Sequence, residues 1–132
     1  MKMRQPMKHT GYFIIPLAWI AVIFIVCLTP SDDLPMTSLA NIPHFDKIVH
    51  FGLYFILAVL LYRPLRTTKA PAGLSVLLVS LFIGGTIELL QYHVIPDRSA
   101  SLMDVAFDIA GAATGLLVYQ LTARGKARGK PV

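Results

Sequence analysis

Hydrophobic residues gather in four long blocks that short polar segments separate. The blocks cover about residues 11–29, 46–63, 72–92 and 101–123. Each is close to the roughly 20 residues that a helix needs to cross the hydrocarbon core of a bilayer. The first block is too long for the apolar core of a signal peptide, about 7–15 residues, and has no small-residue cleavage site. The pattern predicts an all-α, polytopic membrane protein, with four transmembrane helices in an antiparallel bundle that forms one domain over residues 1–123.

Composition supports this class. Hydrophobic residues make up 55% of the chain and charged residues 14%, against about 25% charged in ordinary soluble domains. The net charge is +5, but the basic residues lie in short runs between apolar blocks, which favours membrane lipid over nucleic acid as the partner. The basic segment 124–132 is expected to be a disordered cytoplasmic tail. The single cysteine, Cys27, excludes an intramolecular disulfide and a cysteine-based zinc site.

The charged residues also predict an orientation. Ten of the twelve Lys and Arg residues lie in the N-terminal segment, between the second and third blocks, or after the fourth block. All seven acidic residues fall on the opposite side: Asp32, Asp33, Asp46, Glu88, Asp97, Asp104 and Asp108. Because basic segments stay in the cytoplasm, we expect both termini inside a bacterial cytoplasmic membrane and the acidic side facing outward.

Polar residues recur at helical spacing inside three of the blocks. Asp46, His50 and Tyr54 are spaced i, i+4, i+8 and share one helix face. Glu88 and Gln91 lie within one turn of each other. The fourth block carries a further stripe, which consists of Ser101, Asp104, Asp108, Gly111 and Gly115. Its glycines favour close helix packing, and the polar ends of all three stripes point toward the same membrane surface.

Charged groups at bilayer depth are costly and are functional candidates by default. Glu88 lies near the end of its helix, where the dipole disfavours a negative charge, and Asp108 lies about two turns into the fourth block, beyond the reach of a capping interaction. Together with His50, these two residues form the candidate catalytic set. The alternative for all three is a buried polar network with Lys47 or Arg98.

The candidate ligand-binding residues are Asp46, Lys47, Tyr54, Gln91, Arg98 and Asp104. Two of them have a simple structural alternative. Asp46 and Asp104 fall in first turns, where a carboxylate meets the positive end of the helix dipole, and Ser101 with Asp104 is similar to a capping box. Arg98 is suited either to pairing with the acids or to binding an anionic group such as phosphate.

Three kinds of chemistry are open to such residues. A histidine with several carboxylates is able to hold a divalent metal, with Mg²⁺, Ca²⁺ or Mn²⁺ favoured by oxygen-rich ligands and Zn²⁺ as a further option. A histidine–carboxylate pair is able to act as general acid and base. The same groups also suit binding of a polar head group without any reaction. No recognised metal or nucleophile motif decides among these, so the pattern leaves enzymatic activity open.

The spacing of these residues resembles the VanZ-like family of small bacterial membrane proteins, over about residues 30–122. The matching positions are Asp46, Lys47, His50, Phe51 and Tyr54, then Glu88 and Gln91, then Arg98, Ser101 and Asp104, and finally Asp108, Gly111 and Gly115. One departure is Asp108, where the family pattern more often has Asn. The resemblance implies a cell-envelope protein. The family's namesake is associated with low-level resistance to the glycopeptide teicoplanin.

The leading hypothesis is a protein that binds, or binds and modifies, an amphipathic ligand at an outward-facing polar site. A lipid-linked cell-wall precursor or a lipoglycopeptide fits this description. The alternative is a non-catalytic subunit that packs against another membrane protein or a second copy, with the polar residues as an internal ion-pair network. An ion-coupled lipid or solute transporter is the third hypothesis, but four helices enclose little volume and the inner half shows no polar pathway.

Overall fold

The computed structural model describes residues 9–30, 42–96 and 98–129. A short 3-10 helix, η1 (His9–Phe13), leads into α1 (Ile14–Leu28), and three longer helices follow: α2 (Phe45–Leu65), α3 (Ala72–Val94) and α4 (Leu102–Arg128). No strand occurs in these ranges. Four helical segments are long and apolar enough to cross a membrane, the first of them counted from Gly11 to Leu28. The all-α fold and the four spans predicted from the sequence are confirmed.

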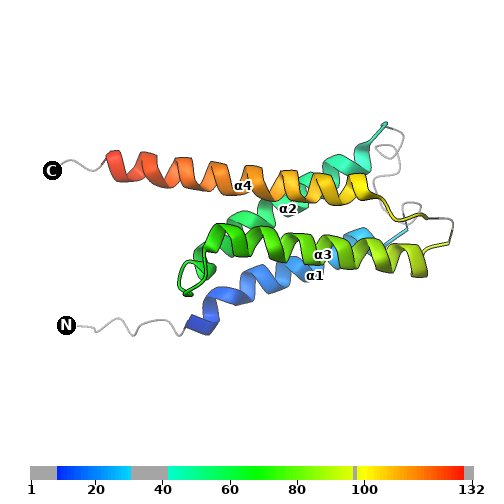
Figure 1. Ribbon diagram of the computed structural model, residues 1–132, viewed down its shortest axis with the longest axis horizontal. Helices are drawn as coiled ribbons and strands as arrows, with labels where there is room; N and C mark the ends of the chain where they lie inside the picture. The colour runs from blue at the N-terminus through cyan, green and yellow to red at the C-terminus, as the bar shows by residue number, and fades with distance from the viewer. Residues whose placement is uncertain (1–8, 31–41, 97, 130–132) are drawn as a thin grey trace.

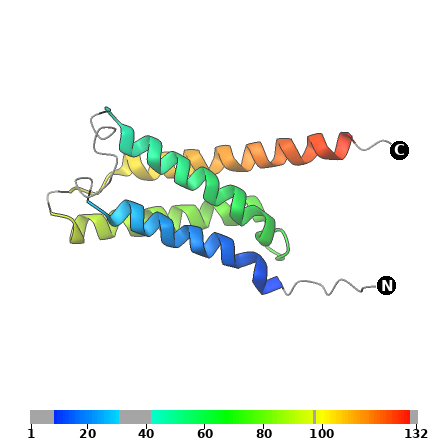
Figure 2. The same cartoon turned by 180° about the vertical axis from the view of Figure 1, so that it is seen from behind.

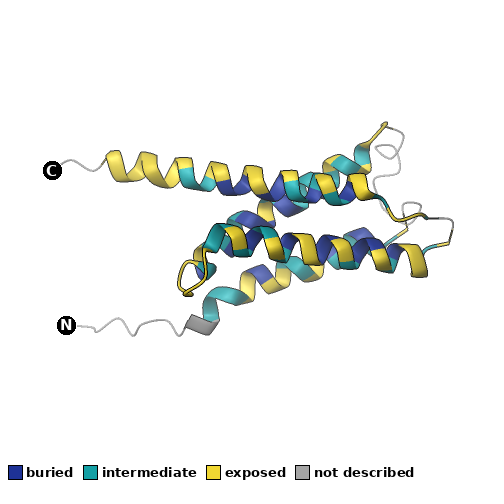
Figure 3. Cartoon of the chain, viewed as in Figure 1, coloured by how far each residue is buried: buried dark blue, intermediate teal, exposed yellow. Residues whose placement is uncertain are grey.

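The helices run alternately in opposite directions, as Figure 1 shows, with η1, the α2–α3 connection and the end of α4 at one end of the molecule. The end of α1, the start of α2 and the α3–α4 connection lie at the other end, and the view from behind agrees (Figure 2). Buried positions face inward between the helices, while exposed positions cover the outside (Figure 3). Large apolar side chains such as Phe82 and Leu102 are 75% and 89% exposed, which suits a surface that faces lipid rather than water.

The closest helix pair is α2 and α4. Gly111 lies against the backbone of Phe51, and Gly115 lies against that of Phe55. A Cβ added at Gly115 would come within 2.5 Å of the Phe55 carbonyl oxygen. Glycine is therefore needed at these positions to let the two backbones approach closely, as the glycine stripe predicts.

A hydrogen bond near the middle of α1 helps to join the first helix to α2. Trp19 of α1 is partly buried, and its Nε1–H donates a hydrogen bond to the carbonyl oxygen of Leu53, at 2.9 Å. Pro16 lies in the first turn of α1. Backbone N–H groups in a first turn have no hydrogen-bond partner within the helix, so the N–H that proline lacks is not needed there and Pro16 does not interrupt the helix. Around these contacts the buried apolar core includes Ile23, Leu57 and Ile87.

The fourth helix is longer than the sequence pattern predicts. Residues 124–128, expected in a disordered tail, are the last turns of α4. The prediction was wrong there because hydropathy marks where the apolar surface ends, not where the helix ends. Ala127 favours helix, and Lys126 and Arg128 stand in the last turn, where positive charge stabilises the helix terminus. The rest of the expected tail, apart from Gly129, lies outside the described residues.

Candidate functional site

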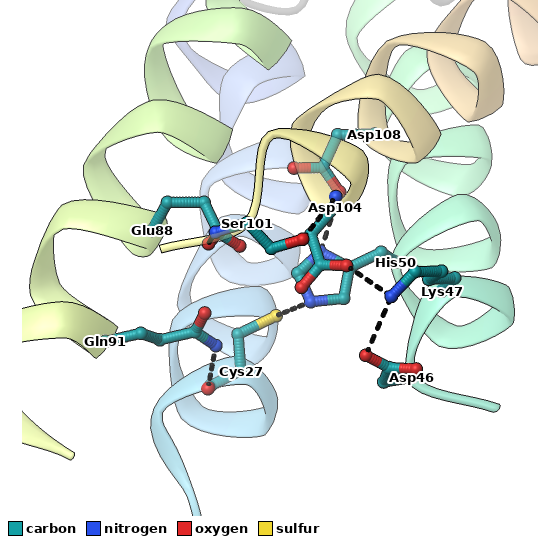
Figure 4. Close-up of polar contacts among 9 residues, drawn as sticks. All are labelled: Cys27, Asp46, Lys47, His50, Glu88, Gln91, Ser101, Asp104 and Asp108. Carbon is teal, nitrogen blue, oxygen red and sulfur yellow. Dashed lines mark hydrogen bonds and ion pairs between the residues drawn. The ribbon is translucent and has the colours of Figure 1, made fainter. Parts of the chain in front are cut away.

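Seven polar side chains gather toward the end of the bundle where α1 ends and α4 begins. Figure 4 shows all of them except Tyr54. We call this set the polar cluster: Lys47, His50, Tyr54, Glu88, Gln91, Asp104 and Asp108. The first three come from the early turns of α2, the next two from the late turns of α3, and the two aspartates from the early turns of α4. All but Lys47 are buried. Burial of so many polar groups is unfavourable unless each is paired.

His50 and Asp108 form the most buried pair. The His50 Nδ1 lies 2.8 Å from Asp108 Oδ1, and the two residues are 3% and 0% exposed. When Asp108 is ionised its carboxylate only accepts hydrogen bonds, and Nδ1 is then the donor. The other ring nitrogen, Nε2, lies 4.0 Å from the thiol sulfur of Cys27 at the end of α1. The pair thus holds the imidazole in one orientation.

Glu88 connects the end of α3 to the start of α4. Its Oε2 accepts a hydrogen bond of 2.6 Å from the backbone N–H of Ser101, which is the N-cap residue of α4. The carboxylate is therefore placed at the positive end of the α4 dipole. This position explains how a negative charge is tolerated near the unfavourable end of its own helix.

The same contact corrects the expected capping box. Ser101 does cap α4, since its Oγ accepts a hydrogen bond of 3.3 Å from the Asp104 N–H. In a capping box the side chain of Asp104 would bond back to the Ser101 N–H. Glu88 takes that donor instead. The Asp104 carboxylate is left for Lys47, whose Nζ lies 3.1 Å from Asp104 Oδ1 and 3.4 Å from Asp46 Oδ2.

Several atoms of the polar cluster are buried without a hydrogen-bond partner. Within the described part of the chain these are Tyr54 Oη, Glu88 Oε1, Gln91 Oε1 and Asp108 Oδ2, with Ser80 Oγ deeper in α3. Each such group costs about 1–3 kcal/mol. The Asp108 oxygen and the Tyr54 hydroxyl both lie beside Gly84, where a Cβ would come within 2.5 Å and 3.5 Å of them. Gly84 thus leaves the space that these two polar atoms occupy.

The predicted site residues do not all converge. One ring nitrogen of His50 and one carboxylate oxygen each of Glu88 and Asp104 lie within 4.8 Å of one another. Asp108 is not one of these three residues and instead contacts the imidazole of His50. The sequence pattern grouped Asp108 with His50 and Glu88, whereas in the structure Asp104 is the third member of the group. The Asp46 side chain is 50% exposed at the rim. Arg98 is partly buried and forms no ion pair with any described residue.

Two contributors were not predicted as site residues. Cys27 approaches His50, and its backbone carbonyl oxygen accepts a hydrogen bond of 2.6 Å from Gln91 Nε2. The only signal for it was its place near the C-terminal end of the first span. The second contributor is the backbone N–H of Ser101, which no side-chain pattern reveals.

Comparison with known protein families agrees with this architecture. A family model described as VanZ/LLP1 matches residues 2–123, nearly the whole chain. The chain belongs to the VanZ/LLP1 family. No curated protein and no solved structure matches it. Every residue of the polar cluster lies inside the region that matches the VanZ/LLP1 model, and the resemblance read from the helical motifs is confirmed.

The chemistry available to this VanZ/LLP1 protein follows from the contacts. The Asp108–His50 pair leaves Nε2 able to accept a proton or to donate electrons to a cation. Glu88 and Asp104 add negative charge beside it. Lys47 compensates part of that charge. The arrangement suits binding of a polar group beneath the membrane surface.

Proposed function

We propose that this VanZ/LLP1 protein binds the polar head group of an amphipathic, lipid-linked ligand in the polar cluster. The observation that supports the proposal is the set of buried atoms without partners: Tyr54 Oη, Glu88 Oε1, Gln91 Oε1 and Asp108 Oδ2. Native proteins pair nearly all such atoms. Three of these four atoms are carboxylate or amide oxygens, which accept hydrogen bonds, so a head group with hydroxyl or ammonium donors would supply the missing partners.

The surroundings favour an amphipathic ligand over a small solute. Leu89, Leu102 and Met103 lie next to cluster residues along the chain, and their apolar side chains are exposed. A hydrocarbon chain would lie along this surface while its head group enters the cluster. Lys47 and the partly buried Arg98 supply positive charge for an anionic head group such as phosphate.

The charge distribution favours the outer leaflet of a bacterial cytoplasmic membrane. Arg63, Arg66 and Lys69 lie at the end of the molecule opposite the polar cluster, as do the basic last turns of α4. The positive-inside rule places that end in the cytoplasm. Lipid-linked cell-wall precursors and lipoglycopeptides meet the membrane on the other side, so this site would suit a role in teicoplanin resistance.

The orientation gives a direct prediction. In a Cys27→Ala background, a cysteine at Ser99 should react with an impermeant maleimide on intact cells, whereas a cysteine at Thr68 should react only after lysis. Both positions are exposed, so access depends on the side of the membrane alone. Labelling of Thr68→Cys in intact cells would place the polar cluster in the cytoplasm and contradict the proposal.

Ligand retention tests the binding itself. Native mass spectrometry of the protein purified from bacterial membranes in mild detergent should detect a retained amphiphile. Glu88→Gln keeps an acceptor for the Ser101 N–H but removes the charge, and retention should fall at least about tenfold, since losing one charged hydrogen bond costs about 1.5–3 kcal/mol. The same variant should lose any teicoplanin tolerance that the wild type confers.

Leu78→Ala is the matched control, because Leu78 is an exposed, lipid-facing leucine of the same helix, ten residues before Glu88 and away from the polar cluster. It should retain the amphiphile and the tolerance at wild-type level. Equal retention by Glu88→Gln and wild type, or no retained amphiphile in either, would remove the support for the site. Farnesyl pyrophosphate, with farnesol as its uncharged counterpart, is a suitable added probe of head-group charge.

A non-catalytic partner subunit is the second candidate, and one observation favours it. Lys47 is already paired with Asp46 and Asp104, and His50 with Asp108, so much of the charge is satisfied internally. This role predicts that Glu88→Gln lowers the thermal stability of the protein. It also predicts that the purified protein carries a partner membrane protein and no retained amphiphile.

A further inference from the structure

Three residues of the polar cluster bring potential metal-ligand atoms close together. His50, Glu88 and Asp104 each offer one ligand atom, and these atoms lie within 4.8 Å of one another. All three residues are at least nine-tenths buried, and they come from three different helices. Ligands brought together from separate helices form a pocket that only the folded bundle presents.

A second observation points to a ligand at this position. Glu88 uses Oε2 to accept the Ser101 N–H, but its Oε1 is buried without any partner in the described part of the chain. Asp104 shows a similar division, since Oδ1 binds Lys47 and Oδ2 has no hydrogen bond among the described residues. Each carboxylate thus uses one oxygen in these contacts, and its other oxygen has no hydrogen-bond partner among the described residues. Figure 4 shows both side chains.

The environment of His50 fits the same role. A histidine that binds a metal through one ring nitrogen usually donates its other N–H to a carboxylate, which fixes the ring and increases its basicity. Asp108 Oδ1 holds Nδ1 at 2.8 Å in this way. In the neutral tautomer with the proton on Nδ1, Nε2 carries the lone pair, and coordination through it keeps the contact with Asp108. Asp108 is then a positioning residue rather than a ligand.

We propose that His50, Glu88 and Asp104 bind one Zn²⁺ ion, with Asp108 orienting His50. Imidazole nitrogen favours Zn²⁺ over Mg²⁺ or Ca²⁺, which prefer oxygen ligands alone. Three protein ligands leave a fourth tetrahedral position open, as in zinc sites that accept water or a substrate oxygen. The positive charge of Lys47 beside Asp104 keeps the site from accumulating excess negative charge. This proposal stands independently of the proposed lipid-linked ligand.

Metal content of the intact chain tests the site. The wild type, stripped with chelator and then dialysed against Zn²⁺ in detergent, should retain one zinc per chain by elemental analysis. Glu88→Gln should bind zinc at least about tenfold more weakly, and Asp108→Asn should show a loss of about 10–100-fold, typical of a residue that orients a ligand. Co²⁺ in place of Zn²⁺ should give tetrahedral d–d absorption in the wild type and lose it in Glu88→Gln.

Asp46→Asn is the matched control. Asp46 lies at the rim of the cluster, contacts Lys47 and is not among the three ligands, so its neutralisation should leave zinc content unchanged. Zinc bound equally by wild type and Glu88→Gln would place the metal elsewhere on the chain and overturn the proposal. Failure of the wild type to retain zinc would overturn it as well. Both readouts measure metal rather than amphiphile, so this site and the lipid-binding proposal are tested separately.

Discussion

Replacing Gly111 by alanine is expected to destabilise the bundle by about 1–3 kcal/mol or more. An added Cβ would collide with the carbonyl oxygen of Phe51 and come within 3.0 Å of its carbonyl carbon and Cα. These are backbone atoms of α2, which cannot rotate away as a flexible side chain does. Relief therefore requires α2 and α4 to separate, and their close approach is what this glycine allows. The free energy of unfolding in detergent, from thermal or SDS titration, measures the effect.

Gly52 and Gly85 provide matched controls within the same bundle. A Cβ at either position meets nothing within 4 Å. Because alanine favours helix over glycine by about 1 kcal/mol, Gly52→Ala and Gly85→Ala should leave the stability unchanged or raise it. If Gly111→Ala unfolded at the same temperature or SDS concentration as these controls, the close packing of α2 against α4 would be contradicted.

The second large effect is expected at Asp108. Asp108→Ala should lower the free energy of unfolding by about 3–5 kcal/mol, because it leaves the buried Nδ1–H of His50 without its partner. Removing both polar groups in His50→Phe with Asp108→Ala should recover part of this loss, since replacing a buried pair with apolar groups is often close to neutral.

A double-mutant cycle over wild type, the two single variants and the double variant isolates the coupling between these side chains. Contact at 2.8 Å in a buried site predicts a coupling well above 0.5 kcal/mol. Additive losses would mean that His50 and Asp108 do not depend on each other, and the fixed orientation of the imidazole would then lack support.

The sequence predicts the parts of this structure that hydrophobicity determines. Apolar blocks long enough to span a bilayer give the four helices, and helical spacing gives the shared faces of His50 with Tyr54 and of Asp104 with Asp108. The glycine stripe also predicts that the fourth helix packs closely on this face, since only small residues allow backbones to approach so closely, but it does not identify α2 as the partner. These features follow from one helix at a time.

The contacts between different helices could not be predicted as well from the sequence. Ser101 and Asp104 have the spacing of a capping box, but the Ser101 N–H donates to Glu88 of another helix. Helical spacing within one segment carries no information about how two helices are aligned along each other. For the same reason the pattern grouped Asp108 with Glu88, whereas the structure places Asp104 there. Cys27 reaches His50 only because of how α1 is placed against α2.

A high-resolution structure would show whether the polar cluster holds a polar ligand group. The protein would be purified from its own membrane with native lipid and without chelator. We expect density for a non-protein group within hydrogen-bond distance of Glu88 Oε1 or Asp108 Oδ2, continuing into a hydrocarbon chain beside Leu102. A cluster in which these oxygens meet only protein atoms and water, with all lipid density elsewhere, would contradict the ligand-binding proposal.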